Sequence, residues 1–243
     1  MINSLSIVFP LFNEENRLPK LFKEIKKFSI KKIFDLEFIF VDDGSIDKSL
    51  ILIKEFKRIN LKKINIKIIS YKQNKGKGYA LKQGALIANK KWTLTMDIDL
   101  SVSFKQINSW VKSKFIKNNG NVYFGSRLLK NSKTITKKYR VFTGNIFNIL
   151  LRILIKNKFL GVQDTQCGFK LYKGNLAKII FKNIKEYGYI HDVEILILIR
   201  KKKFILYELP VNWVHKDGSK INIIKDSLEM FFNLIRLKLR YKL

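Results

Sequence analysis

Two aspartates one residue apart, Asp97 and Asp99, end an apolar run in the segment WTLTMDIDLSVS at residues 92–103. In an extended backbone, side chains two residues apart point to the same side, so we expect both carboxylates to converge while Ile98 faces the core. Two converging carboxylates suit a hard divalent cation that takes its other ligands from water and phosphate oxygens. For this pair alone, an ordinary polar strand end is the simpler interpretation.

A second acidic pair, Asp42 and Asp43, lies in the sequence DDGS directly after another apolar run. The combination of Asp with Gly44 favours a tight turn, and Ser45 is expected to cap the helix that follows. Such a turn does not account for two adjacent carboxylates in a chain this basic. A carboxylate here can accept hydrogen bonds from a uracil or guanine edge, or from a ribose hydroxyl.

A glycine-rich segment, NKGKGYALKQG at residues 74–84, carries Gly76 and Gly78 just before a predicted helix. The segment lacks both the dinucleotide fingerprint and the Gly-Lys-Ser/Thr sequence of a P-loop. This excludes a Rossmann dehydrogenase and a kinase. A glycine turn that starts a helix is the interpretation that remains.

The elements that must position these segments alternate between strand-like and helical runs. Strands are predicted at residues 5–9, 36–41, 64–69 and 92–96, and helices at 18–28, 46–59 and 78–88. This alternation predicts a mostly parallel sheet with helices on both faces. Ligands bind such sheets at the carboxyl ends of the strands, where PLFNEE, DDGS and DIDLS all fall.

The pattern weakens beyond residue 121. The segment NVYFGSR predicts a strand that leaves the sheet, followed by helices at residues 139–155 and 191–200 and a strand at 204–209. The last stretch, residues 223–243, has apolar residues alternating with Lys and Arg at helical spacing. It predicts a basic amphipathic helix suited to a membrane surface, or one that packs on the domain through its apolar face.

Composition narrows the classes of partner and compartment. The 243 residues carry a formal net charge of +30, which predicts affinity for nucleic acid, anionic lipid or phosphorylated substrates. Drift in amino-acid composition explains the same charge equally well.

The single cysteine, Cys167, permits no disulfide within the chain and fits a reducing compartment. The start, MINSLSIVFP, does not read as a signal peptide, and no run is long enough to span a bilayer.

The segments FPLFNEE, VDDGS, NKGKGYALKQG, DIDLS, GSR and DTQCGFKLY occur in the order used by glycosyltransferase family 2, which the chain resembles over nearly its whole length. With VEI and PVNWVHKDGSK, DTQCGFKLY is most similar to the polyprenyl-phosphate sugar transferases, especially the dolichyl-phosphate β-glucosyltransferases. The resemblance implies an α/β GT-A fold, a nucleotide-sugar donor, Mg²⁺ or Mn²⁺, and inversion at the anomeric carbon. It implies one catalytic domain at residues 1–221, divided near residue 126 into nucleotide-sugar and acceptor halves, and a basic helix at 222–243.

The resemblance also implies roles for individual residues. Those expected to bind the nucleotide sugar are Pro10, Phe12, Glu14, Asp42, Asp43, Lys77, Asp97, Ile98 and Asp99. Those expected near the acceptor and the sugar are Arg140, Asp164, Lys170, Asp192, Glu194, Ser219 and Lys220. Those expected to act in catalysis are Asp99, Arg127, Arg140 and Asp164, with Asp97 and Asp99 holding the metal. Because Asp192 and Glu194 are two residues apart on a helix, only one of them is expected to face the site unless the helix begins there.

The implied reaction transfers a hexose, with UDP-glucose favoured over GDP-mannose as donor, to a polyprenyl or dolichyl phosphate at an anionic membrane surface. The protein is then expected to be cytoplasmic and peripheral on the inner face of the membrane, with no nucleic-acid partner. A related transferase acting on a diacylglycerol or glycan hydroxyl is the alternative, and Asp164 would then serve as its general base. A non-catalytic nucleic-acid-binding protein is a remote third hypothesis, and the oligomeric state stays open.

Overall fold

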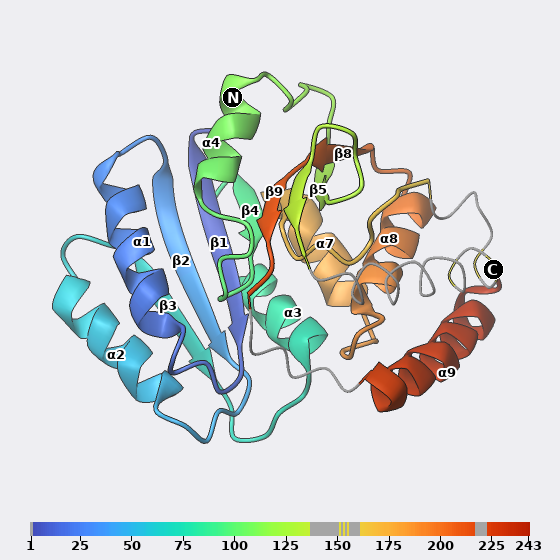
Figure 1. Ribbon diagram of the computed structural model, residues 1–243, viewed down its shortest axis with the longest axis horizontal. Coiled ribbons are helices and arrows are strands. Elements are labelled where there is room, and N and C mark those ends of the chain that lie inside the picture. The colour runs from blue at the N-terminus through green and yellow to red at the C-terminus, as the bar shows by residue number, and fades with distance from the viewer. Residues whose placement is uncertain (1, 137–150, 152, 154, 156–160, 217–222) are drawn as a thin grey trace.

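The computed structural model describes residues 2–136, 151, 153, 155, 161–216 and 223–243, and its centre is a seven-stranded sheet (Figure 1). In the order β3-β2-β1-β4-β7-β5-β8, the strands are Ile66–Ser70, Asp35–Asp42, Ser4–Leu11, Trp92–Thr95, Lys170–Lys173, Val122–Ser126 and Leu206–Pro210. Neighbouring strands pair in parallel, except that β7 runs antiparallel to both β4 and β5. The mostly parallel sheet confirms the predicted fold class.

Helices cover both faces of the sheet. They are α1 (Leu18–Ile30), α2 (Ser49–Asn60), α3 (Lys77–Ile87), α4 (Lys105–Lys112), α7 (Gly174–Asn183), α8 (His191–Lys201) and α9 (Ile223–Tyr241). In β1, Ile7 and Phe9 pack into one core cluster with α1, α2 and α4, whereas Val8 packs into a second with α3, α7, α8 and α9. Alternate residues of a strand point to opposite faces, so each central strand supplies both cores.

Most of the predicted elements are present, with ends shifted by a few residues, but one strand was placed wrongly. The segment NVYFGSR does not leave the sheet: β5 lies inside it, between β7 and β8, and Val122 and Phe124 are fully buried. Both partners of β5 come much later in the chain, so its local sequence carried no sign of them. The helix predicted at residues 139–155 lies largely outside the described residues.

The sequence pattern also missed several short elements. Helices α4 and α7 were not predicted, nor was strand β7 within DTQCGFKLY. Strands β6 (Lys133–Ile135) and β9 (Asn212–Val214) form a separate two-stranded parallel sheet. This small sheet follows β5 and β8 and therefore lies near the same end of the large sheet as the predicted ligand site.

Helix α9 is fastened to the domain by two buried carboxylates. Glu186 accepts hydrogen bonds from Arg236 at 2.6 Å and from Arg240 at 2.7 Å. Glu194, which is fully buried on α8, accepts bonds from the hydroxyl of Tyr241 at 2.7 Å and from the backbone N–H groups of residues 185 and 186, each at 2.7 Å. A buried carboxylate is stable only with such partners, so α9 completes this part of the core.

Replacing Glu194 by Gln should therefore destabilise the protein. The single amide oxygen cannot accept all three bonds, and the amide NH2 group has no acceptor in this buried position, so we expect a loss of about 3 kcal/mol in the free energy of unfolding. Urea denaturation measures this value. The control is Glu24→Gln, which removes a surface ion pair with Lys27 and should change stability by less than about 0.5 kcal/mol. Equal stability of the two variants would contradict the anchoring role.

Candidate active site

The loops after β1 and β2 are tied together at the carboxyl edge of the sheet. The hydroxyl of Ser45 accepts a hydrogen bond from the backbone N–H of Asn13 at 2.9 Å, and the Asn13 side chain accepts one from the N–H of Ile46 at 2.8 Å. Ser45 does not cap the next helix, as the sequence had suggested. Asp47 accepts the N–H of Ser49 instead, at 2.9 Å, because α2 begins later than expected.

The two carboxylates of DDGS have different partners. Asp43 is buried and accepts the backbone N–H of Lys75 at 2.8 Å and that of Gly76 at 2.9 Å. Asp42 accepts the hydroxyl of Ser70 at 3.1 Å and the N–H of Ser45 at 3.3 Å. Asp42 therefore holds its own turn, as expected, while Asp43 holds the glycine-rich loop before α3. Whether Asp43 also contacts a nucleoside stays a prediction.

The DID segment lies in a turn rather than in an extended strand, which corrects one premise of the sequence analysis. Strand β4 ends at Thr95, and Leu100 has a φ of 57°. Ile98 nevertheless packs in the core, as predicted. The Asp99 carboxylate accepts the backbone N–H of Ser101 at 2.8 Å, which fixes its position in the turn.

Lys77, at the start of α3, forms an ion pair with Asp97. Its ammonium donates to Oδ1 of Asp97 at 2.6 Å, and the two side chains are 41% and 38% exposed. The surrounding protein desolvates this ammonium, which opposes its charged form, but Asp97, Asp192 and Asp99 outweigh that effect and raise its pKa. The charges of three predicted site carboxylates therefore act on one lysine at the start of α3, and Asp97 is the one in contact with it.

The segment DTQCGF reaches the same point through a glycine. A Cβ atom at Gly168 would lie 2.4 Å from Oδ2 of Asp97, so any side chain there would displace the Asp97 carboxylate. The Gly168 carbonyl accepts the hydroxyl of Thr95 at 2.9 Å, which joins this segment to the end of β4. Gly168 was not among the predicted site residues, although a glycine inside a recognised motif was a usable signal.

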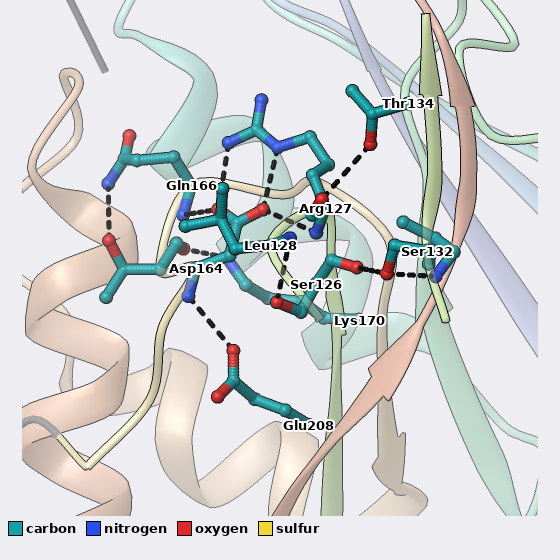
Figure 2. A network of polar contacts seen from close by, with 11 residues as sticks. Ser126, Arg127, Leu128, Ser132, Thr134, Asp164, Gln166, Lys170 and Glu208 are labelled. Atoms are coloured by element: carbon teal, nitrogen blue, oxygen red, sulfur yellow. Dashed lines mark hydrogen bonds and ion pairs between the residues drawn. The ribbon is translucent and has the colours of Figure 1, made fainter. Parts of the chain in front are cut away.

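Arg127 and Asp164 form a two-pronged ion pair (Figure 2). Nε and Nη2 of Arg127 donate to the two carboxylate oxygens at 2.7 and 2.8 Å, and its backbone N–H donates at 3.0 Å. Burial alone would raise the pKa of Asp164, but the bonds and the charge of Arg127 outweigh it and hold that pKa below its ordinary value. The charge of Asp97 also acts on Arg127, so this pair lies within electrostatic reach of the DID turn.

Glu208 supports this pair from β8 and was missed by the sequence analysis. One carboxylate oxygen accepts the backbone N–H of Asp164 at 2.9 Å (Figure 2). The other accepts the backbone N–H of Gln163 at 2.7 Å. On the other side, the Arg127 guanidinium lies over the ring of Trp213, 5.6 Å from its centroid. Glu208 belongs to none of the recognised motifs. Its role arises only when β8 pairs with β5 in the folded sheet, so the local sequence gave no sign of it.

Lys170 and Asp192 form a buried pair behind the site. The Lys170 ammonium donates to Asp192 and to the carbonyl of Thr165, at 2.8 Å in the second case, and both side chains are almost fully buried. Burial opposes the charged form of Asp192, but the charges of His191, Lys170 and Lys77 outweigh it and lower the pKa. The pair therefore supports α8 and β7 from inside, and its predicted contact with the acceptor is untested.

The remaining predicted residues fall into three groups. Pro10, Phe12 and Glu14 lie partly exposed near the end of β1, where Glu14 pairs with Arg17 at 2.9 Å. Glu194 bonds to α9, while Asp192, two residues earlier, pairs with Lys170. The two side chains diverge even though α8 begins at His191, the case in which both could have faced the site. The predicted residues that lie outside the described part of the chain are Arg140, Ser219 and Lys220.

A metal ion fits this site only if a ligand completes its coordination. Within residues 2–136, 161–216 and the other described positions, no cluster of three or more His, Cys, Asp or Glu side chains could enclose a cation. Asp97 and Asp99 offer half-exposed carboxylate oxygens at the edge of the sheet. Such a donor set suits Mg²⁺ or Mn²⁺ that shares its shell with water and phosphate oxygens.

Comparison with solved structures identifies the fold. The chain aligns with mannosyl-3-phosphoglycerate synthase from Rubrobacter xylanophilus at a TM-score of 0.67 and 15% identity, covering 96% of this chain and 72% of that one. It aligns with glucosyl-3-phosphoglycerate synthase from Mycobacterium tuberculosis, in complex with Mn²⁺, UDP and glucosyl-3-phosphoglycerate, at a TM-score of 0.65 and 16% identity. That alignment covers 98% of this chain and 78% of the synthase. The fold is thus the GT-A fold.

Sequence comparison identifies the family. A model described as Glycosyl transferase family 2 matches residues 6–181. Dolichyl-phosphate beta-glucosyltransferase from Dictyostelium discoideum is 35% identical over 248 residues, covering 98% of this chain and 75% of the relative. The human dolichyl-phosphate beta-glucosyltransferase is 30% identical over 249 residues, with coverages of 98% and 75%. The chain therefore belongs to glycosyl transferase family 2, as a relative of the dolichyl-phosphate beta-glucosyltransferases.

Proposed function

We propose that this glycosyltransferase moves glucose from UDP-glucose to a polyprenyl or dolichyl phosphate, with inversion at the anomeric carbon. The names of the relatives support glucose and a lipid phosphate. The UDP in the mycobacterial synthase supports a uridine donor, with GDP-mannose as the second donor to test. The observation that carries the proposal is the Arg127–Asp164 pair, because it suits an acceptor that needs no general base.

The charge state of Asp164 decides whether it can act as a general base. A carboxylate whose pKa lies below its ordinary value, and whose two oxygens already accept bonds from Arg127, is a weak proton acceptor. A phosphate monoester loses its second proton at a pKa of about 6 and is already nucleophilic at neutral pH. Asp164 then orients Arg127, whereas a diacylglycerol or glycan hydroxyl would require a proton to be taken.

The reaction places negative charge on the leaving diphosphate as an acceptor oxygen attacks the anomeric carbon from the opposite face. Lys77 and Arg127 are the cations that lie around Asp97, and they can stabilise this charge more in the transition state than in the ground state. A Mg²⁺ or Mn²⁺ ion held by Asp97 and Asp99 would add Lewis-acid neutralisation of the same charge.

Helix α9 is the surface that we assign to an anionic membrane. Phe232 and Leu239, seven residues apart and thus on one face, are 65% and 73% exposed. The exposed Lys242 lies three residues after Leu239 and adds about 1 kcal/mol of attraction near an anionic surface. None of the described helices is both long and apolar enough to cross a bilayer. A peripheral position is consistent with these features, and the inner membrane face stays a prediction.

A transfer assay tests the reaction itself. Purified protein with Mg²⁺ and radiolabelled UDP-glucose should label polyprenyl phosphate but not diacylglycerol, and Asp99→Asn should lower the rate at least about a hundredfold because the leaving charge loses its stabilisation. Asn can still accept the Ser101 N–H bond, so folding should survive. Glu24→Gln serves as the active control. Label only in diacylglycerol would establish the alternative acceptor class.

The pH dependence separates the two roles of Asp164. With polyprenyl phosphate, the wild-type rate should rise as the pH passes through about 6, where the acceptor ionises, and should then stay level. Asp164 itself stays ionised over this range, because its pKa is lowered and it takes up a proton only at more acidic pH. Asp164→Asn should keep the same profile at a rate roughly 10- to 100-fold lower, through misplacement of Arg127. Loss of the rise near pH 6 in the variant would instead make Asp164 the titrating base.

Membrane binding has its own test. Replacing Phe232 and Leu239 together by Ser should weaken binding to vesicles that contain anionic lipid by roughly tenfold or more, because two exposed apolar side chains no longer insert. Vesicle co-sedimentation measures the binding. The matched control replaces Ile51 and Ile59, each 65% exposed on α2 at the far side of the molecule (Figure 1), and should change nothing. Equal weakening by both double variants would remove the special role of α9.

A further inference from the structure

The Asp97 carboxylate is enclosed from two sides. Oδ1 accepts the Lys77 ammonium at 2.6 Å, and Oδ2 faces Gly168 so closely that a Cβ there would lie 2.4 Å away. A divalent cation approaching Oδ1 would meet the ammonium in the same position. The two positive groups would compete for one oxygen, since like charges at contact distance repel strongly.

The backbone around Lys77 is fixed, while the end of its side chain is not. Gly76, whose φ is 96°, donates to Asp43 at 2.9 Å, and Gly78 donates to the carbonyl of Tyr187 at 2.8 Å. Added Cβ atoms on these glycines would lie 2.5 and 2.7 Å from their nearest neighbours. Lys77 is therefore held at its Cα between two anchored residues, with a side chain 41% exposed that has room to rotate.

The Lys77–Asp97 pair contributes little to stability. Both side chains are more than a third exposed, and ion pairs of this kind add on the order of 0–1 kcal/mol. By contrast, Arg127–Asp164 and Lys170–Asp192 each include a side chain that is almost fully buried. Of these three pairs in the site, Lys77–Asp97 is the one that can open without disturbing the core.

We propose that Lys77 acts as an exchangeable counter-ion: its ammonium occupies the metal position on Asp97 in the free enzyme and moves to the diphosphate when the donor binds. This inference rests on the proposed function, because it takes a nucleotide diphosphate as the incoming group. The exchange keeps the charge of Asp97 neutralised in both states. The exchange couples the binding of metal and donor. A metal ion bound alone would displace the Lys77 ammonium with no diphosphate to receive it, and a diphosphate bound alone would draw the ammonium away and leave Asp97 without a counter-charge.

Mn²⁺ titration followed by electron paramagnetic resonance tests this exchange without measuring catalysis. In the absence of nucleotide, Lys77→Gln should bind Mn²⁺ about tenfold more tightly than the wild type, because the competing ammonium is gone. Saturating UDP should tighten Mn²⁺ binding by the wild type by about tenfold or more and should affect the variant much less. Lys77→Arg, which keeps the charge, should behave like the wild type.

Two further variants make the result specific. Lys72→Gln removes an exposed charge from the same loop and should leave Mn²⁺ binding unchanged. Adding Asp97→Asn to Lys77→Gln should abolish the tighter binding. The proposal is overturned if Lys77→Gln binds no more tightly than Lys72→Gln, or if the gain survives the loss of Asp97. Because the titration contains no acceptor, failure of glucose transfer to lipid phosphate would refute the proposed function and leave this result standing.

Discussion

Charge compensation at the carboxyl edge of the sheet is the constraint on which the rest of this structure depends. Asp97, Asp99 and Asp192 all act on the single ammonium of Lys77, and Asp164 is bound in two-pronged fashion by Arg127. Carboxylates at a partly buried edge are stable only with cations or N–H donors beside them. A diphosphate with a divalent cation fits such an edge. The cation can pair with the carboxylates, and the negative diphosphate can pair with the Lys77 ammonium.

The same constraint connects the edge to the C-terminal helix. The N-terminus of α3, which carries Lys77, is hydrogen-bonded to the carbonyl of Tyr187. The neighbouring Glu186 holds α9 through Arg236 and Arg240, and Glu194 fastens the backbone of residues 185 and 186. Helix α9, which we propose faces the membrane, and Lys77, which we propose binds the donor, therefore share one supporting segment, residues 184–190. The helix has an inward face that completes the core and an outward face that carries Phe232 and Leu239.

The first half of the fold could be predicted because its strands and helices alternate and each has a clear local pattern. Asp42, Asp97 and Asp99 follow such strands, and their common edge followed from the topology alone. The second half could not be predicted in this way, because β5 pairs with β7 and β8, which come much later in the chain. For the same reason Glu208 was missed, whereas Gly168 lies in the DTQCGFKLY motif and could have been found there. The turn at DID and the true partner of Ser45 depend on loop geometry that no periodic pattern encodes.

The most direct test of the account is a crystal structure with UDP and Mn²⁺, using the anomalous signal of manganese to locate the metal. The account predicts manganese between the diphosphate and the carboxylates of Asp97 and Asp99, with the uridine beside Asp43. It predicts that Arg127 remains paired with Asp164. Manganese and diphosphate bound away from the DID turn, or a free Asp164 carboxylate turned toward the acceptor, would contradict it.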